Sequence, residues 1–192
     1  MNLTKRNTRN SFLSPMQLFA MAAGALLYAA LTIPFNTLPI PDSGGLVALR
    51  PTVAIPMLFG IIFGPFTGLV SGLVGNVVSD YVSFSGTSWN WDIASGLLGA
   101  IPGVAYLVIS RADWTKRKTI AHIAALAILA SFAGAGFGAL IDYFYQVNAG
   151  PNNTALLSFA SVGLTDAING AILTPTLLFS YAKATFGRAR RL

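Results

Sequence analysis

The sequence predicts an all-α membrane protein whose six transmembrane helices form one bundle. Hydrophobic residues make up 54% of the 192 residues and charged residues only 9%, whereas a soluble domain carries about 25% charged residues. The apolar residues gather in segments long enough for helical spans, and most segments contain glycine or proline, which membrane helices tolerate. This composition excludes a soluble globular enzyme and an intrinsically disordered chain.

The first three predicted spans cover residues 17–33, 53–63 and 66–84. The first ends before Pro34 and follows a basic segment, but it lacks the small-residue cleavage site and polar continuation of a cleaved signal peptide. The second is short because Gly64 and Pro65 end it, so neighbouring helices must cover it. The third begins directly after this turn.

The last three predicted spans cover residues 93–110, 119–145 and 155–181. A basic segment that contains Arg111 and Lys116 separates the fourth span from the fifth. The fifth span is rich in alanine and glycine, and the sixth runs to about Tyr181. The connections are too short to fold alone, so residues 1–192 are expected to form a single six-helix membrane domain.

The basic residues test this count, because cytoplasmic loops of membrane proteins carry an excess of lysine and arginine. With the N-terminus inside, all basic residues except Arg50 fall on the inner side: Lys5, Arg6, Arg9, Arg111, Lys116, Arg117, Lys118, Lys183, Arg188, Arg190 and Arg191. We therefore expect a multi-pass protein of the cell membrane with both termini in the cytoplasm. The same rule explains the net charge of +6 without a nucleic-acid partner.

Several kinds of chemistry lack the residues they need. The chain has no cysteine and a single histidine, His122, which disfavours a metal site. It has no Gly-x-x-x-x-Gly-Lys-Ser/Thr phosphate loop and no Ser/His/Asp set. We expect no cofactor, no metal and no enzymatic activity. Uphill transport would need energy from a partner protein or an ion gradient.

Polar residues inside the predicted spans indicate a site in the outer half of the membrane, because each costs about 2.5–3.5 kcal/mol on insertion scales. Asn76 and Asp80 share one face of the third span at four-residue spacing. Asp142 lies near the outer end of the fifth span. Asp166 and Asn169 lie in the outer half to the middle of the sixth.

Two outer loops add to this set. Arg50 ends the loop before the second span, and Trp89, Asn90 and Trp91 lie in the loop before the fourth. Together with the polar span residues they predict a cup that is open to the outside and has an apolar floor. Such a cup suits a small molecule whose planar ring stacks on tryptophan and whose polar edges bind arginine and aspartate.

Several of these residues also have a purely structural interpretation, and Asp142 suits a solvated position at the edge of a loop. Trp89 and Trp91 fit the aromatic belt of any membrane protein. Asp80 pairing with Arg50 would lock two helices, and Asn76 and Asp166 suit hydrogen bonds between helices. The first span also carries Ala25 and Ala29 at four-residue spacing. Such small-residue pairs pack helices within a bundle or form a docking face for another membrane subunit.

A longer pattern runs through the first half of the chain: Leu49-Arg50-Pro51, Ala54-Ile55-Pro56, Phe59-Gly60, Phe63-Gly64-Pro65, Gly68, Gly72, Gly75-Asn76 and Asp80, then Trp89-Asn90-Trp91 and Gly99-Ala100-Ile101-Pro102-Gly103. This stretch, from about Ala25 to Gly103, resembles the substrate-binding S components of energy-coupling factor (ECF) vitamin transporters, most closely the riboflavin-type branch. The last two spans match this family in pattern only.

The resemblance implies a function and partners. S components bind a vitamin or a related small molecule in a pocket that faces outside, and the first-to-second loop, here about Pro39 to Arg50, acts as a lid. They dock on a membrane T component through alanines that match Ala25 and Ala29. Two cytosolic ATPase subunits drive the T component, and the S component topples in the membrane to carry its site inward.

Three other functions stay open at this point. A stand-alone carrier or channel would transport without a partner, and a proton-coupled form would use Asp80, Asp142 or Asp166. A ligand-free structural membrane protein would use Asn76 and Asp166 only for packing. A small membrane enzyme has neither a metal set nor a nucleophile with its base.

Overall fold

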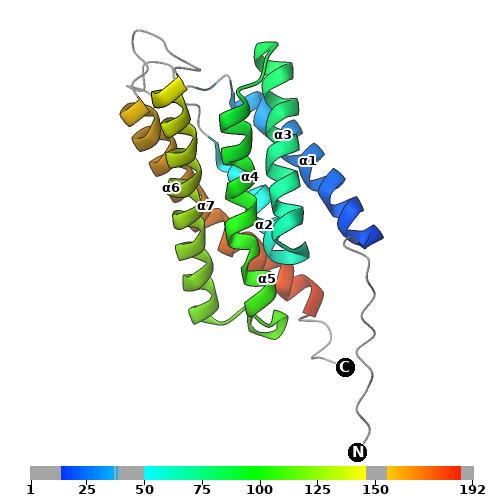
Figure 1. Cartoon of the computed structure of the whole chain (residues 1–192). Helices are drawn as coiled ribbons and strands as arrows, with labels where there is room; N and C mark the ends of the chain where they lie inside the picture. The colour runs from blue at the N-terminus through cyan, green and yellow to red at the C-terminus, as the bar shows by residue number, and fades with distance from the viewer. Residues whose placement is uncertain (1–13, 37, 39–49, 146–154, 187–192) are drawn as a thin grey trace, which may run out of the picture.

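The computed structural model describes residues 14–36, 38, 50–145 and 155–186. Within these ranges the regular structure is helical throughout (Figure 1). In chain order the elements are α1 (Pro15–Phe35), η1 (Pro51–Val53), α2 (Ala54–Phe63), α3 (Pro65–Phe84), α4 (Trp89–Gly103), α5 (Ala105–Val108), η2 (Arg111–Asp113), α6 (Arg117–Tyr145) and α7 (Ala155–Phe186). The prediction of an all-α protein is confirmed for this part of the chain.

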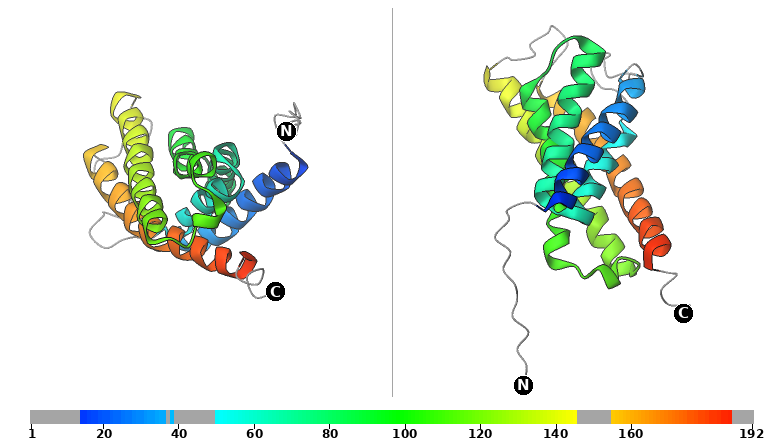
Figure 2. Two further views of the ribbon diagram at one scale, coloured as in Figure 1. Left: turned by 90° about the horizontal axis from the view of Figure 1, so that it is seen from below. Right: turned by 90° about the vertical axis from the view of Figure 1, so that its right-hand side faces the viewer.

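The helices form a bundle in which α2 occupies the middle. Neighbours pack in the order α1, α3, α4, α6 and α7, and α2 contacts α1, α3, α4 and α7. Figure 1 shows α6 on one side of the bundle and α1 on the other, with α7 running diagonally from the α6 side across the bundle. Figure 2 shows that α1 crosses α3 obliquely. Short α2 is therefore surrounded by protein, as its length requires.

Glycines bring α3 and α4 into backbone contact. A Cβ atom added at Gly68 would collide with the carbonyl group of Gly99, and one added at Gly72 would collide with the carbonyl oxygen of Ser95. Small residues permit such close approach between membrane helices. Gly68 and Gly72 therefore serve packing inside the bundle.

Within the described ranges, four helical segments are long and apolar enough to cross a membrane: Pro15–Phe35, Trp89–Val108, Arg117–Tyr145 and Ala155–Phe186. Helix α3 also has 20 residues but is less apolar than these four, because its buried face carries small and polar residues such as Ser71, Asn76 and Ser79. Its outer face is apolar, with Val74, Val78 and Val82 exposed.

Several boundaries differ from the sequence prediction. Helix α1 continues through Pro34 to Phe35, and α7 continues to Phe186. Trp89, Asn90 and Trp91, expected in a loop, form the first turn of α4, which starts four residues before the predicted span. The backbone N–H groups of Trp91 and Asp92 both donate to the carbonyl oxygen of Ser88, which begins this turn. The predicted fourth span is also divided at Val104, between α4 and α5, just after Pro102.

The basic residues that the structure describes gather toward one end of the bundle. Arg111 and Lys116 lie in the connection between α5 and α6, Arg117 and Lys118 open α6, and Lys183 lies in the last turn of α7. Figure 1 places these segments at the same end. The other basic residues used in the topology prediction, apart from Arg50, lie outside the described residues.

The face of α1 expected to dock a partner is turned inward. Ala25 is 6% exposed and Ala29 is 3% exposed. A Cβ atom added at Gly75 of α3 would lie 2.8 Å from the carbonyl oxygen of Ala25, so the two helices are in close contact there. The exposed residues of α1 are mostly apolar and include Phe19, Leu26, Leu27 and Leu31.

Candidate functional site

A polar network surrounds Arg50, the residue that precedes η1. One guanidinium nitrogen of Arg50, Nη2, donates to the hydroxyl oxygen of Tyr28 at 2.8 Å, to Oδ1 of Asn76, and to Oγ of Ser95 at 3.5 Å. These partners come from α1, α3 and α4. One side chain from the loop therefore joins three helices in the interior of the bundle.

Asn76 connects this cation to two carboxylates. Its Oδ1 accepts from Arg50 and, at 3.4 Å, from the hydroxyl of Tyr28. Its Nδ2 donates to Oδ2 of Asp80 at 3.0 Å and to Oδ1 of Asp92 at 2.9 Å. The side chain is only 1% exposed, and both its donors and its acceptor are used. Asp80 and Arg50 are therefore linked by hydrogen bonds through Asn76, and they form no direct ion pair with each other.

A small cavity lies beside this network, with a volume of about 10 Å³, which is roughly enough for one water molecule. Its wall includes Arg50, Trp91 and Ser95, and Asp166 of α7. Asp166 is 2% exposed. Among the described residues, Nε of Arg50 and Oδ1 of Asp166 are both buried without a hydrogen-bond partner. One hydrogen-bond donor and one acceptor, on two residues that line the same cavity, therefore have no partner. Burying such groups without a partner costs free energy of folding.

Below the network the interior is apolar. Val53, Met57, Leu98, Ala127 and Ala130 form a buried hydrophobic cluster from η1, α2, α4 and α6. This agrees with the predicted apolar floor. Among the described residues no open cup is formed, because the polar side chains bind one another around a cavity of about 10 Å³. The predicted lid, residues 39–49, lies outside the described residues.

A second polar cluster joins the first turn of α4 to the end of α6. Nε1 of Trp91 donates to Oδ2 of Asp142 at 2.9 Å, and Nδ2 of Asn90 donates to Oδ1 of Asp142 at 2.8 Å. Asn90 is fully buried, whereas Trp89 is 49% exposed. Asn169 is half-buried on α7, one turn from Asp166.

Comparison with known protein families matches residues 12–183 to the family described as ECF-type riboflavin transporter, S component. The chain belongs to this family. The family model covers the whole bundle, including the last two helices. The same kind of comparison finds no significant match among curated proteins or among solved structures.

The family assignment makes the chain an S component of a membrane transporter for vitamin uptake. Its predicted site residues divide into three groups in the structure. Arg50, Asn76, Asp80 and Asp166 lie around the small cavity or its network, Asn90, Trp91 and Asp142 form the α4–α6 cluster, and Trp89 and Asn169 stand apart from both. Trp91 belongs to the cluster and also to the cavity wall.

Three residues of the S component's network are missing from the predicted site residues: Tyr28, Asp92 and Ser95. Tyr28 is fully buried and binds both Arg50 and Asn76, and Ser95 faces Arg50 from α4. The sequence signal that could have identified Tyr28 is its hydroxyl group in the middle of a mostly apolar span. Ser95 has no comparable signal, because serine is common in packed membrane helices.

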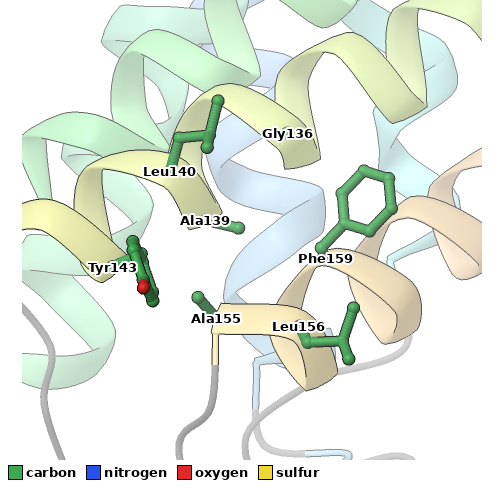
Figure 3. A pocket seen from close by; sticks show the side chains of 7 residues that line it. All are labelled: Gly136, Ala139, Leu140, Tyr143, Ala155, Leu156 and Phe159. Atoms are coloured by element: carbon green, nitrogen blue, oxygen red, sulfur yellow. The ribbon is translucent and has the colours of Figure 1, made fainter.

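A larger hollow lies elsewhere on this S component. Figure 3 shows it between α6 and α7, with a volume of about 430 Å³, and its wall is formed by Gly136, Ala139, Leu140, Tyr143, Ala155, Leu156 and Phe159. Only the hydroxyl of Tyr143 offers a side-chain polar group there. A vitamin with several polar edges needs convergent polar groups, so the network around Arg50 is the better candidate site despite its smaller volume.

Proposed function

We propose that this S component captures riboflavin, or a closely related heterocycle, between α1, α3, α4 and α7. The observation that carries the proposal is the pair of buried groups without partners, Nε of Arg50 and Oδ1 of Asp166, in one cavity wall with Trp91. The flavin ring system presents carbonyl oxygens and an N–H group on one planar edge. A donor, an acceptor and an indole ring complement such an edge.

The described cavity is a closed arrangement of this site. Riboflavin is far larger than one water molecule, so the elements around Arg50 separate when it binds. Arg50 lies directly after the 39–49 segment and before η1, and its guanidinium joins three helices. Displacement of this side chain would therefore break the hydrogen bonds by which it joins the three helices.

The site includes Trp91 and Asp92 in the first turn of α4, whereas the basic α5–α6 connection follows the other end of that helix. This arrangement supports an outward-facing site and a six-span topology with cytoplasmic termini. Delivery into the cell then requires a T component and two ATPase subunits, with toppling of the S component in the membrane. We place the T-component contact on the exposed face of α1, because Ala25 and Ala29 are buried.

The first experiment is gentle purification of the full chain, mass spectrometry of any copurified small molecule, and calorimetric titration with riboflavin. Binding of one riboflavin with nanomolar affinity supports the proposal. A protein that binds neither riboflavin nor other vitamins refutes it and favours a carrier or a structural protein. Uptake by liposomes that contain this chain alone would favour the stand-alone carrier.

The docking face is tested by two tryptophan substitutions on α1. Ala30→Trp, on the exposed face, should preserve riboflavin binding and stop uptake that depends on the T component and ATPases. Ala25→Trp, on the buried face, should destabilise the protein itself. Normal uptake by the Ala30→Trp variant would exclude this face as the contact.

A further inference from the structure

The carboxylate of Asp142 connects the end of α6 to two side chains on the first turn of α4. Its Oδ2 accepts from the indole N–H of Trp91 at 2.9 Å, and its Oδ1 accepts from the amide of Asn90 at 2.8 Å. The amide of Asn90 also donates to the carbonyl oxygen of Gly138, one turn earlier on α6, at 3.0 Å. Hydrogen bonds to a charged acceptor are stronger than those between neutral groups.

The indole ring of Trp91 is also fixed by packing. A Cβ atom added at Gly138 would lie 2.8–2.9 Å from three ring carbons, so the ring lies directly against the backbone of α6. The ring thus has its N–H held by Asp142 and one side held by Gly138. Trp91 contributes to the cavity wall with Arg50 and Asp166, whereas Asp142 does not.

We propose that Asp142 is a positioning residue for vitamin binding: it sets the orientation of Trp91, which forms the aromatic wall of the site, and does not touch the vitamin. The inference rests on the proposed function, since it assigns a role within the same site. It also replaces the sequence-based interpretation of Asp142 as a direct ligand contact. Asp142 binds Trp91 but is not among the residues that line the cavity.

A double-mutant cycle separates the indirect role from a direct one. Asp142→Asn should weaken riboflavin binding by about tenfold, because the fixed ring orientation is lost with the charge-assisted hydrogen bond. Trp91→Phe keeps an aromatic ring but has no N–H group to bind Asp142. In the Trp91→Phe background, Asp142→Asn should therefore change the affinity less than twofold. An equal loss in both backgrounds, or no loss in the wild-type background, overturns the proposal.

Near-ultraviolet circular dichroism gives a readout that does not depend on the vitamin. Immobilised indole rings give strong signals, so Asp142→Asn should reduce the band that Trp91→Phe also removes. Asp113→Asn is the matched control, because Asp113 pairs with Lys116 at the opposite end of the bundle and should change neither affinity nor spectrum. An unchanged spectrum in Asp142→Asn overturns the positioning role.

Gly138→Ala keeps Asp142 and displaces the ring by steric contact, which protects the test if Asp142→Asn fails to fold. It should reduce riboflavin affinity and alter the same spectral band. An altered band with wild-type affinity overturns the assignment of Trp91 as the wall of the site. If wild-type protein does not bind riboflavin, the proposed function fails, while the spectra still decide whether Asp142 orients Trp91.

Discussion

Replacing Asn76 by leucine should destabilise the bundle by about 3 kcal/mol. Leucine has a similar size, so the main change is the loss of the amide. Asp92, which is buried, loses its charge-assisted hydrogen bond, which is worth about 1.5–3 kcal/mol. Arg50 keeps Tyr28 and Ser95 and loses about 1 kcal/mol. Asp80 is partly exposed, and water replaces most of its bond.

Asn36 provides a matched control on the same helix pair. Its amide donates to Oγ of Ser79 at 2.9 Å and to Oγ of Ser83 at 3.0 Å, so both partners are neutral and the residue is half-buried. Asn36→Leu should cost about 1 kcal/mol, close to the average of about 0.6 kcal/mol for hydrogen bonds in membrane proteins. The two variants differ mainly in whether the amide serves charged groups.

Reversible unfolding of the purified chain in mixed detergent micelles measures both free energies. A loss for Asn76→Leu that is two to four times the loss for Asn36→Leu confirms the reasoning. Equal losses near 1 kcal/mol would show that Asp92 and Arg50 find other partners when the amide is removed, and the network would then be no more than ordinary helix packing.

Three further predictions use the same protein preparation. Gly72→Ala should destabilise the bundle by about 1–3 kcal/mol because its Cβ meets the α4 backbone, whereas Gly86→Ala, with open space around it, should leave the unfolding midpoint unchanged. Tyr28→Phe removes only the hydroxyl that binds Arg50 and should lower stability by about 1 kcal/mol in the same unfolding assay; unchanged stability would contradict that bond. Asp166→Asn should weaken riboflavin binding by about tenfold or more in calorimetry if its free oxygen accepts from the vitamin, and wild-type affinity would remove Asp166 from the site.

The helices could be predicted closely because apolar length and the Gly64-Pro65 turn determine them locally. The first turn of α4 could not, because Trp89 and Trp91 fit an interfacial loop equally well and the helix there depends on packing against α6. The division of the fourth span at Val104 was missed for a similar reason. Proline and glycine inside membrane helices are often tolerated without a break.

Which residues lie together in the polar network could be predicted better than which of them bind one another. The depth of Asn76 and Asp80 in the third span correctly indicated that they lie in one region with Arg50 from the preceding loop. A polar residue inside the membrane needs a partner. Depth does not indicate which partner is chosen. The bond between Trp91 and Asp142 joins residues 51 positions apart, on helices whose rotation about their axes the sequence does not specify. The burial of Ala25 likewise depends on how α1 is rotated about its axis.

The amide of Asn76 lowers the energetic cost of freeing Arg50 to bind a ligand. A direct ion pair between Arg50 and Asp80 would have to be broken before the cation turned toward an incoming molecule, and in a poorly hydrated interior this step would be slow and costly. The amide instead acts as a dipolar spacer, with its oxygen toward the cation and its nitrogen toward both carboxylates. Opposite charges are balanced at a distance, and the guanidinium keeps one N–H group uncommitted. A protein that binds a small molecule tightly and later releases it benefits from an arginine that is not held in a direct ion pair.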